Sequence, residues 1–440
     1  MELLKAGIAS GAFHNSSERY DPPKCYPHTR LAVIEAIMDW IKDGQKTSFL
    51  MWLYGPAGAG KSAIAQTIAE MCHGLGILAA SFFWSRNAAG RNNETCLIAS
   101  LAYQLIIMIP EMRIHVEKAI ENDPVLLSRS LDAQMESLVI EPLEKTFLGS
   151  HEQTVDLGEP KLVILDGLDE CGGPGVQEYI LKVISTAILR FPLRIHILIA
   201  SRPEQGIRDS FNAKPLLSIT TRLPLDDKYL PDDDIGHFLI DSLTALKESH
   251  ILRSLLPTTW PTTKDIDMLV QKSSGQFIYA ATVVKFVKSP RRRPDEQLKI
   301  ILGIGGTGKH TPFSELDALY LHIFSTVEYL PRVLEIMSCL YFLHSHFYPR
   351  VDNIENLLFY TQGDVHLILI DMHSILDVPD ITSSKPLDVF HASLQDFLMD
   401  PNRSGTFFLD ESIARARLAQ CFLRHIPNFP TSTSNPCKYM

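Results

Sequence analysis

The sequence predicts an α/β domain built on a mainly parallel sheet of five strands, followed by an all-α helical domain and a winged-helix domain. Between residues 46 and 222, short apolar runs with the features of buried strands alternate with stretches of helical apolar spacing. This alternation is typical of α/β sandwiches with parallel sheets. After residue 222 helical patterns dominate. We expect a lead segment and first helix at 1–45, the α/β domain at 46–222, the helical domain at 223–312, the winged-helix-like domain at 313–410, and a truncated helical start with a tail at 411–440.

Composition excludes several classes of protein. The chain has 440 residues, of which 45% are hydrophobic and 21% charged, as in ordinary soluble globular proteins. Its formal charge of −10 argues against nucleic acid as the principal partner. The 7 cysteines form no CxxC pair, which favours reduced structural thiols over a zinc site or a disulfide framework. Because no apolar run reaches the length of a membrane span, we expect no membrane partner and a cytoplasmic location.

Residues 1–30 have the pattern of an extended, turn-rich lead segment. Prolines and polar residues interrupt any apolar periodicity there. Leu31, Ile34, Met38 and Ile41 then recur at helical spacing, and Gly44 is a stop signal. Two interpretations of the lead remain open: it covers the adenine and ribose of a bound nucleotide, or it is a plain surface linker.

A complete phosphate loop follows the first predicted strand. Residues 48–54 are apolar and predict a buried strand, the next eight residues read GPAGAGKS, and 62–73 have helical spacing. The glycines let backbone N–H groups point at phosphate oxygens. The helix N-terminus favours negative charge there. Lys61 supplies a charge for the β- and γ-phosphates, and the Ser62 hydroxyl is a ligand for Mg²⁺. The predicted phosphate-binding residues are Gly55, Pro56, Ala57, Gly58, Ala59, Gly60, Lys61, Ser62 and Ala63.

An acidic strand end comes next along the chain. We expect a strand at 79–84, helices at 94–121 and 131–149, and a strand at 161–166 that ends in Asp166. The carboxylate of Asp166 is suited to hold Mg²⁺. Asp169 and Glu170 follow in the run ILDGLDE, and one of them is the candidate that orients or deprotonates the attacking water.

Two further strands complete the predicted sheet. Residues 194–200 form a buried apolar run that ends shortly before Arg202, and 216–220 is the last candidate strand. Ligands collect at the carboxyl ends of parallel strands. Arg202 therefore either faces the γ-phosphate or is a solvated arginine after a strand.

The second half of the chain has helical patterns at 232–250, 264–272 and onwards to 287. The run GIGGTGKH at 303–310 meets the phosphate-loop spacing, but His310 replaces the Mg²⁺-ligating hydroxyl, so we interpret it as a flexible loop. Residues 367–378 and 387–398 fit a small helix–strand winged module. His391, within the second run, is either a packed core residue or a functional one.

Several of these motifs together resemble the fungal NACHT-domain proteins of the STAND class of signalling ATPases, and in particular the nephrocystin-type NACHT set related to NOD-like receptors. The resemblance covers about residues 10–425 and is carried by Thr29-Arg30, GPAGAGKSAIAQTIAE, SFFWSR, ILDGLDEC, IASRPE, SSGQFIYAATVVKFV, FSELDALY, LHSHFYP and HASLQDFL. Its most specific part is the Asp-Gly-Leu-Asp-Glu form of the acidic strand end.

The resemblance implies a switch that closes over ADP and opens when ATP replaces it, which then allows self-association. It implies ATP/ADP and Mg²⁺ as cofactors, with Ser62 and Asp166 on the metal. It further implies that Asp169 or Glu170 serves hydrolysis and that Arg202 is a catalytic-site sensor of the γ-phosphate. It also implies nucleotide contacts from Thr29, Arg30, Gly275 and His391. Phe277 stands where relatives carry a proline, which weakens the prediction for Gly275.

The resemblance also implies effector and sensor regions, which partner chains would supply if this chain is a switch core rather than a fragment. Two other interpretations compete with a slow ATPase switch. One is a scaffold that holds nucleotide without turnover. The other is a metabolic P-loop kinase, although the sequence has no acceptor-site motif.

Overall fold

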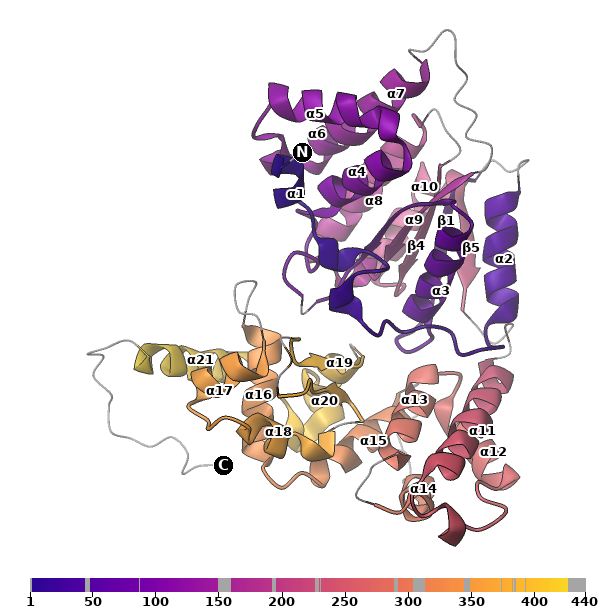
Figure 1. The fold of residues 1–440 in the computed structure, drawn as a ribbon, viewed down its shortest axis with the longest axis vertical. Helices are drawn as coiled ribbons and strands as arrows, with labels where there is room; N and C mark the ends of the chain where they lie inside the picture. The colour runs from indigo at the N-terminus through magenta and orange to yellow at the C-terminus, as the bar shows by residue number, and fades with distance from the viewer. Residues whose placement is uncertain are drawn as a thin grey trace. The chain divides into compact units, whose positions relative to one another are not determined.

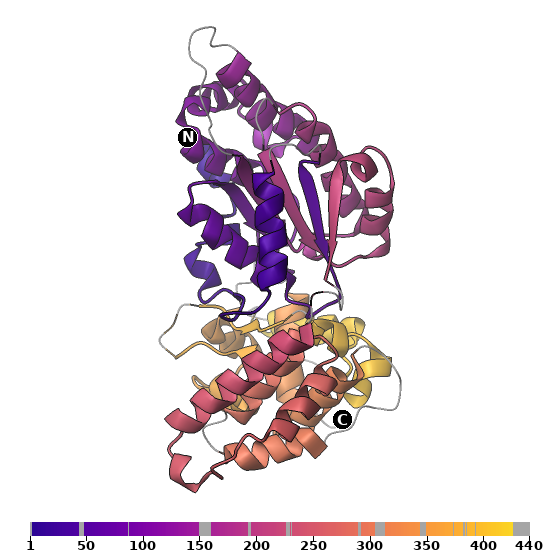
Figure 2. The same ribbon diagram turned by 90° about the vertical axis from the view of Figure 1, so that its right-hand side faces the viewer.

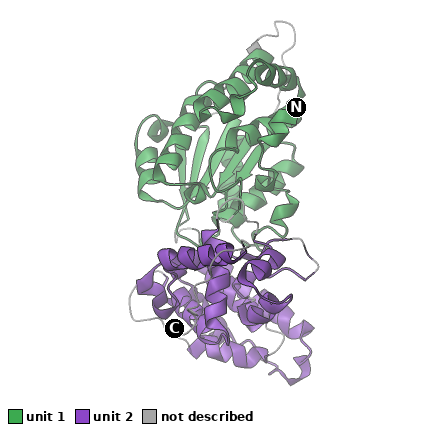
Figure 3. Ribbon diagram, turned by 90° about the vertical axis from the view of Figure 1, so that its left-hand side faces the viewer, with its two compact units in different colours: residues 1–230 green, residues 231–440 purple. Residues whose placement is uncertain are grey.

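The computed structural model divides the chain into two compact units, residues 1–230 and 231–440, coloured separately in Figure 3. Each unit is described by itself. The described residues are 2–43, 48–86, 88–148, 160–191, 195–225, 229, 231–288, 292–303, 313–343, 349–372, 374–381, 383, 385–391 and 393–425. The predicted loops at 151–160 and 303–310 and the tail at 426–440 lie wholly or mostly outside these residues.

Unit 1 contains the predicted parallel sheet. Its five strands run in the order β2-β3-β4-β1-β5, and every neighbouring pair is parallel. The order places the phosphate-loop strand β1 beside β4, and the acidic strand β3 between β2 and β4. All carboxyl ends therefore meet at one edge, where ligands collect in such sheets. The strands are β1 Leu50–Tyr54, β2 Leu78–Phe83, β3 Lys161–Asp166, β4 Ile195–Ser201 and β5 Thr220–Pro224.

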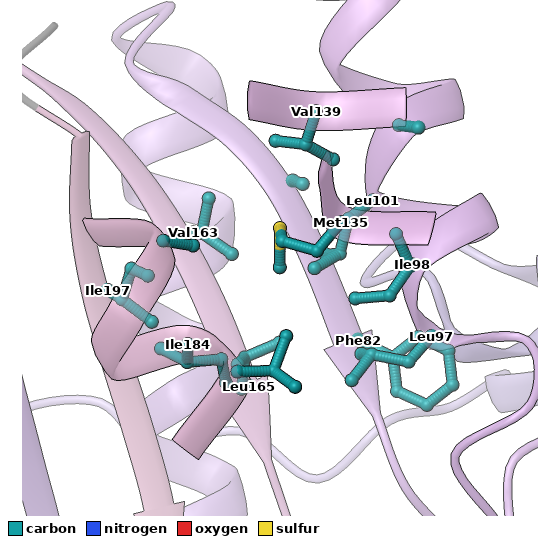
Figure 4. Close-up of a cluster of buried hydrophobic side chains, with 14 of the residues drawn as sticks. Phe82, Leu97, Ile98, Leu101, Met135, Val139, Val163, Leu165, Ile184 and Ile197 are labelled. Carbon is teal, nitrogen blue, oxygen red and sulfur yellow. The ribbon is translucent and has the colours of Figure 1, made fainter. Parts of the chain in front are cut away.

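Helices cover both faces of this sheet (Figures 1 and 2). Alternating side chains of β3 show why: Leu162 and Ile164 pack with residues of α2 and α3, whereas Val163 and Leu165 pack against α4 and α8. Figure 4 shows part of the second cluster. The α-helices of unit 1 are α1 Glu2–Ala6, α2 Leu31–Lys42, α3 Lys61–Gly74, α4 Leu97–Met108, α5 Arg113–Asn122, α6 Leu131–Met135, α7 Glu141–Leu148, α8 Pro174–Ile188, α9 Gln205–Asn212 and α10 Leu216–Ile219.

Three predicted elements of unit 1 were wrong in part. The expected strand at 216–220 is mostly helix α10, and the strand begins only at Thr220, where pairing with β1 starts. The expected helix at 94–121 is broken, because α4 ends before Pro110, which opens a 3-10 turn ahead of α5. The expected helix at 131–149 contains a π-helical segment, Glu136–Ile140, between α6 and α7.

Among its described residues, unit 2 is mainly helical. It also has a small antiparallel ribbon, β6 Leu376–Asp377 with β7 Asp388–Val389, and an isolated antiparallel bridge between Arg350 and Pro386. This ribbon gives the last part of the fold its winged-helix character. Within the described residues, no helix is long and apolar enough to cross a membrane. The α-helices are α11 Pro231–Ser249, α12 Thr263–Ser273, α13 Phe277–Val287, α14 Pro294–Gly303, α15 Ser314–Ser325, α16 Leu330–Phe342, α17 Val351–Leu358, α18 Asp364–Ile368, α19 Ser393–Leu398, α20 Pro401–Ser404 and α21 Glu411–Arg424.

Candidate nucleotide-binding site

The phosphate loop joins the end of β1 to the start of α3, and its conformation requires glycine at two positions. Gly58 and Gly60 have φ angles of 76° and 92°, a region that L side chains rarely adopt. Gly60 is the N-cap residue immediately before α3, so the loop leads directly into the N-terminus of a 14-residue helix. This is the geometry in which backbone N–H groups and the helix dipole favour an anion.

Lys61 lies across the mouth of its own loop. Its Nζ donates hydrogen bonds to the carbonyl oxygens of Gly55 and Pro56, at 2.9 and 2.8 Å. Burial lowers the pKa of Lys61, while the nearby carboxylate of Asp169 acts in the opposite direction. The ammonium group is thus held at the loop by exchangeable contacts to carbonyl oxygens.

Ser62 and Asp166 meet at the start of α3 and the end of β3. The Ser62 hydroxyl donates to the Asp166 carboxylate, whose side chain is buried. Burial raises the pKa of Asp166 to about 6, and the bond from Ser62 opposes the rise. Oδ1 of Asp166 has no hydrogen-bond partner among the described residues, although it is buried. A buried carboxylate oxygen without a donor, beside a hydroxyl, fits a hard cation such as Mg²⁺.

Asp169 is held in place by two arginines from neighbouring strand ends. Its Oδ1 accepts a hydrogen bond of 2.9 Å from the Arg202 backbone N–H, and its Oδ2 lies 3.2 Å from Arg202 Nε. Arg86, just beyond β2, brings a guanidinium nitrogen to 3.9 Å from the same carboxylate. Arg202 is therefore at the carboxyl edge of the sheet as predicted, with its side chain paired to Asp169. Contact with a γ-phosphate stays a prediction.

Glu170 is half-buried and accepts one hydrogen bond, 3.3 Å long, from the Arg86 backbone N–H. Burial, and after it the charge of Asp169, raise the pKa of Glu170 to about 7. The carboxylate consequently gains and loses its proton near neutral pH, which suits a general base.

The lead segment reaches the phosphate loop through Arg30. Its guanidinium donates to the carbonyl oxygen of Ala59 at 3.0 Å, and its backbone is left-handed, with φ 59°. The Thr29 hydroxyl donates to the Tyr26 carbonyl at 2.7 Å and so closes a local turn. Direct nucleotide contacts from Thr29 and Arg30 stay predictions.

The two remaining predicted residues belong to unit 2. Gly275 precedes α13 with φ 75°, and a Cβ there would lie 3.3 Å from Pro231 Cγ. His391 lies in the turn before α19, not within a longer helix as the pattern of 387–398 suggested. Its Nδ1 accepts a hydrogen bond of 3.0 Å from the Ser393 N–H, so His391 caps the start of α19. Their roles in nucleotide binding stay predictions.

Sequence reasoning missed two arginines near this edge of the sheet. Arg86 lies three residues after the end of β2, and the reason for selecting Arg202, its position after a strand end, applies to Arg86 as well. Arg19 lies in the lead segment, where its guanidinium covers the ring of Phe83 at 3.7 Å. No local pattern marks Arg19, because its position depends on how the lead folds against α3.

The family model described as Nephrocystin 3, N-terminal, matches residues 32–202, a span that contains the loop, the acidic strand end and Arg202. Unit 1 is a P-loop NTPase domain. No curated protein matches the chain.

Several solved structures are similar to this chain. They include the Aeropyrum pernix ORC2 protein in ADPNP-ADP complexes (13% identity, 93% of this chain and 100% of that one, TM-score 0.38). Cdc6p from Pyrobaculum aerophilum gives 9% identity over 92% and 98%, with TM-score 0.33. Drosophila ORC bound to DNA gives 15% identity over 85% and 84%, with TM-score 0.36. Similarities this low support no inference about function.

Proposed function

We propose that this protein is an ATP/ADP-operated switch that hydrolyses ATP slowly, of the NACHT and STAND signalling class. The observation that carries the proposal is the buried Oδ1 of Asp166, which lacks a hydrogen-bond donor among the described residues and lies beside the Ser62 hydroxyl that binds the same carboxylate. Such a pair costs stability unless a cation completes it.

The residues present fit Mg²⁺ and a nucleoside triphosphate. Ser62 and Asp166 would hold the metal, and the loop N–H groups with Lys61 would hold the phosphates. Bound Mg²⁺ would supply positive charge to the phosphate oxygens on which negative charge develops. The nearby Glu170 carboxylate, with its pKa raised to about 7, would accept the proton of the attacking water.

Asp169 and Arg202 support a sensing role. Their ion pair at 3.2 Å joins the loop after β3 to the end of β4, so any anion that attracts Arg202 must compete with Asp169. A γ-phosphate is present in ATP and absent from ADP. Competition for Arg202 would therefore differ between the two nucleotides, and a ligand shifts an equilibrium only through such a difference.

The direct test of the switch is self-association. We expect the purified protein to be smaller by light scattering with Mg²⁺-ADP than with a non-hydrolysable Mg²⁺-ATP analogue, because the triphosphate opens the closed form. A metabolic kinase or a static scaffold would have the same size with both nucleotides. We place the signalling role in NOD-like innate immunity or self/non-self recognition, by family resemblance.

His391→Ala is expected to release ADP about 10- to 100-fold faster, the equivalent of one charged hydrogen bond. Because Nδ1 accepts the Ser393 N–H, a neutral ring carries its proton on Nε2, and under the proposed function this N–H would donate to a phosphate oxygen of ADP. Stopped-flow release of a fluorescent ADP analogue measures the rate.

Ser393→Ala is the matched control for His391→Ala. The Ser393 hydroxyl lies 2.8 Å from His391 Nδ1 and 2.9 Å from the Tyr320 hydroxyl, so its loss disturbs the same turn without removing the imidazole. If both variants melt at equally lowered temperatures with and without ADP, and release stays at the parental rate, His391 is a packing residue only.

A further inference from the structure

A buried side-chain amide, that of Gln66, binds the lead segment to the phosphate-loop helix α3. Gln66 is only 1% exposed, and it lies one turn after Ser62 on α3. Its Nε2 donates to the His14 carbonyl at 2.9 Å, and its Oε1 accepts from Arg19 at 2.9 Å. The backbone N–H of Cys25 adds a bond of 3.0 Å to the neighbouring Thr67 hydroxyl. Residues 14–25 therefore lie against the helix whose first turn forms the metal site.

Arg19 is brought by these contacts to the same face of the sheet as Asp166. Its guanidinium covers the Phe83 ring at 3.7 Å, and Phe83 is the register partner of Asp166 on the neighbouring strand. Register partners on adjacent strands are about 4.8 Å apart and point to the same face. Ser62 and Gln66 lie on one side of α3, since they are four residues apart. The guanidinium of Arg19 thus lies close to the pair formed by Ser62 and Asp166.

The charges of Arg19 and Asp166 attract each other across this short distance. Burial lowers the pKa of Arg19 to about 10, and Asp166 is the largest influence that raises it. In turn Arg19 lowers the pKa of Asp166 against the effect of burial. A partly desolvated carboxylate needs such a counter-charge in the absence of a metal. A divalent cation held by Asp166 would face the positive guanidinium.

We propose that Arg19 is a resident counter-charge of the metal site, and that Mg²⁺ binding and docking of residues 14–25 on α3 oppose each other. The proposal rests on the metal role given above to Ser62 and Asp166. Arg19 acts through Asp166 and is a positioning residue, not a catalytic one. Through Arg19, binding of Mg²⁺ weakens the docking of residues 14–25 on α3, and docking weakens the binding of Mg²⁺.

The test measures the ADP dissociation constant in EDTA and again in saturating Mg²⁺, and divides the first value by the second. This ratio reports the coupling between metal and nucleotide, and a purely structural defect weakens both affinities and leaves it unchanged. For Arg19→Gln, measured at a pH at which Asp166 is ionised in both proteins, we expect the ratio to rise on the order of tenfold, because a unit charge no longer repels the metal. Arg19→Lys retains the charge and should stay near the parental ratio.

Lys24→Gln is the matched control, because it removes another positive charge of the lead that contacts α3, through Glu70 at 3.0 Å. This substitution should leave the ratio within about twofold of the parental value, since its partner Glu70 is not a metal ligand. An unchanged or reduced ratio in Arg19→Gln would overturn the inference. If the parental protein binds no ADP, or binds it equally with and without Mg²⁺, the proposed function fails instead.

Hydrogen exchange provides a second readout that needs no variant to fold. Amides of residues 14–25 should exchange faster in Mg²⁺-ADP than in ADP with EDTA, because the metal weakens the hold on Arg19. Equal exchange in the two conditions would contradict the opposition between metal binding and docking.

Discussion

Glu170→Gln is expected to slow single-turnover ATP hydrolysis by about 10²–10⁴-fold, the usual contribution of a general base, and to leave the affinity for an ATP analogue unchanged. The reason is that the two adjacent carboxylates, Asp169 and Glu170, have different partners. Asp169 is engaged by Arg202 through both a backbone bond of 2.9 Å and an ion pair of 3.2 Å. Glu170 accepts a single 3.3 Å bond, and burial raises its pKa to about 7. Rapid-quench measurement of the hydrolysed phosphate gives the rate.

If Glu170 is the general base, its pKa also predicts how the rate of hydrolysis depends on pH. A general base works only in its ionised form, so the parental single-turnover rate should rise with pH through about 7 and level off above it. Glu170→Gln should lose this rise. Asp169→Asn serves as the control, because it removes the partner of Arg202 and leaves Glu170 in place. It should keep the rise but move it to lower pH, since the charge of Asp169 contributes to the raised pKa of Glu170. If Asp169→Asn abolishes the rise and Glu170→Gln hydrolyses at the parental rate, the two roles are reversed.

Lys61→Ala should lower the affinity for ATP and ADP by about 10²–10⁴-fold, which corresponds to two charge-assisted hydrogen bonds. The fold should survive, because the hydrogen bonds that the Lys61 ammonium donates go to carbonyl oxygens of its own loop. Isothermal calorimetry measures the affinity, and a melting curve without nucleotide checks the fold. Lys42→Ala, at an exposed lysine in the last turn of α2, is the control. If Lys61→Ala binds ATP and ADP with the parental affinity, the assignment of residues 55–62 as a phosphate loop is wrong.

The sequence was sufficient for the parts of the site that local patterns determine. The strand, glycine loop and helix around Lys61 follow from contiguous residues, and so does the end of β3 at Asp166. The ion pair of Asp169 with Arg202 could not be derived, because it depends on β3 and β4 being neighbours in the sheet. The same holds for Arg19, whose position requires the lead to fold over α3.

Misassigned elements were those in which two patterns compete. The short apolar run of α10 has no length or periodicity that separates strand from helix, and pairing with β1 decides where β5 begins. His391 lies between β7 and α19 because its imidazole replaces the missing backbone acceptor at the start of that helix. The apolar spacing of residues 387–398 gives no sign of this turn.

The proposed switch requires a nucleotide held in the P-loop domain of unit 1. Purified protein should be denatured, and the released small molecules identified by chromatography and mass spectrometry. We expect ADP at close to one equivalent per chain, with little or none in Lys61→Ala prepared in the same way, because slow hydrolysis leaves a switch closed over its product. The parental protein releasing no more adenine nucleotide than Lys61→Ala would contradict the switch.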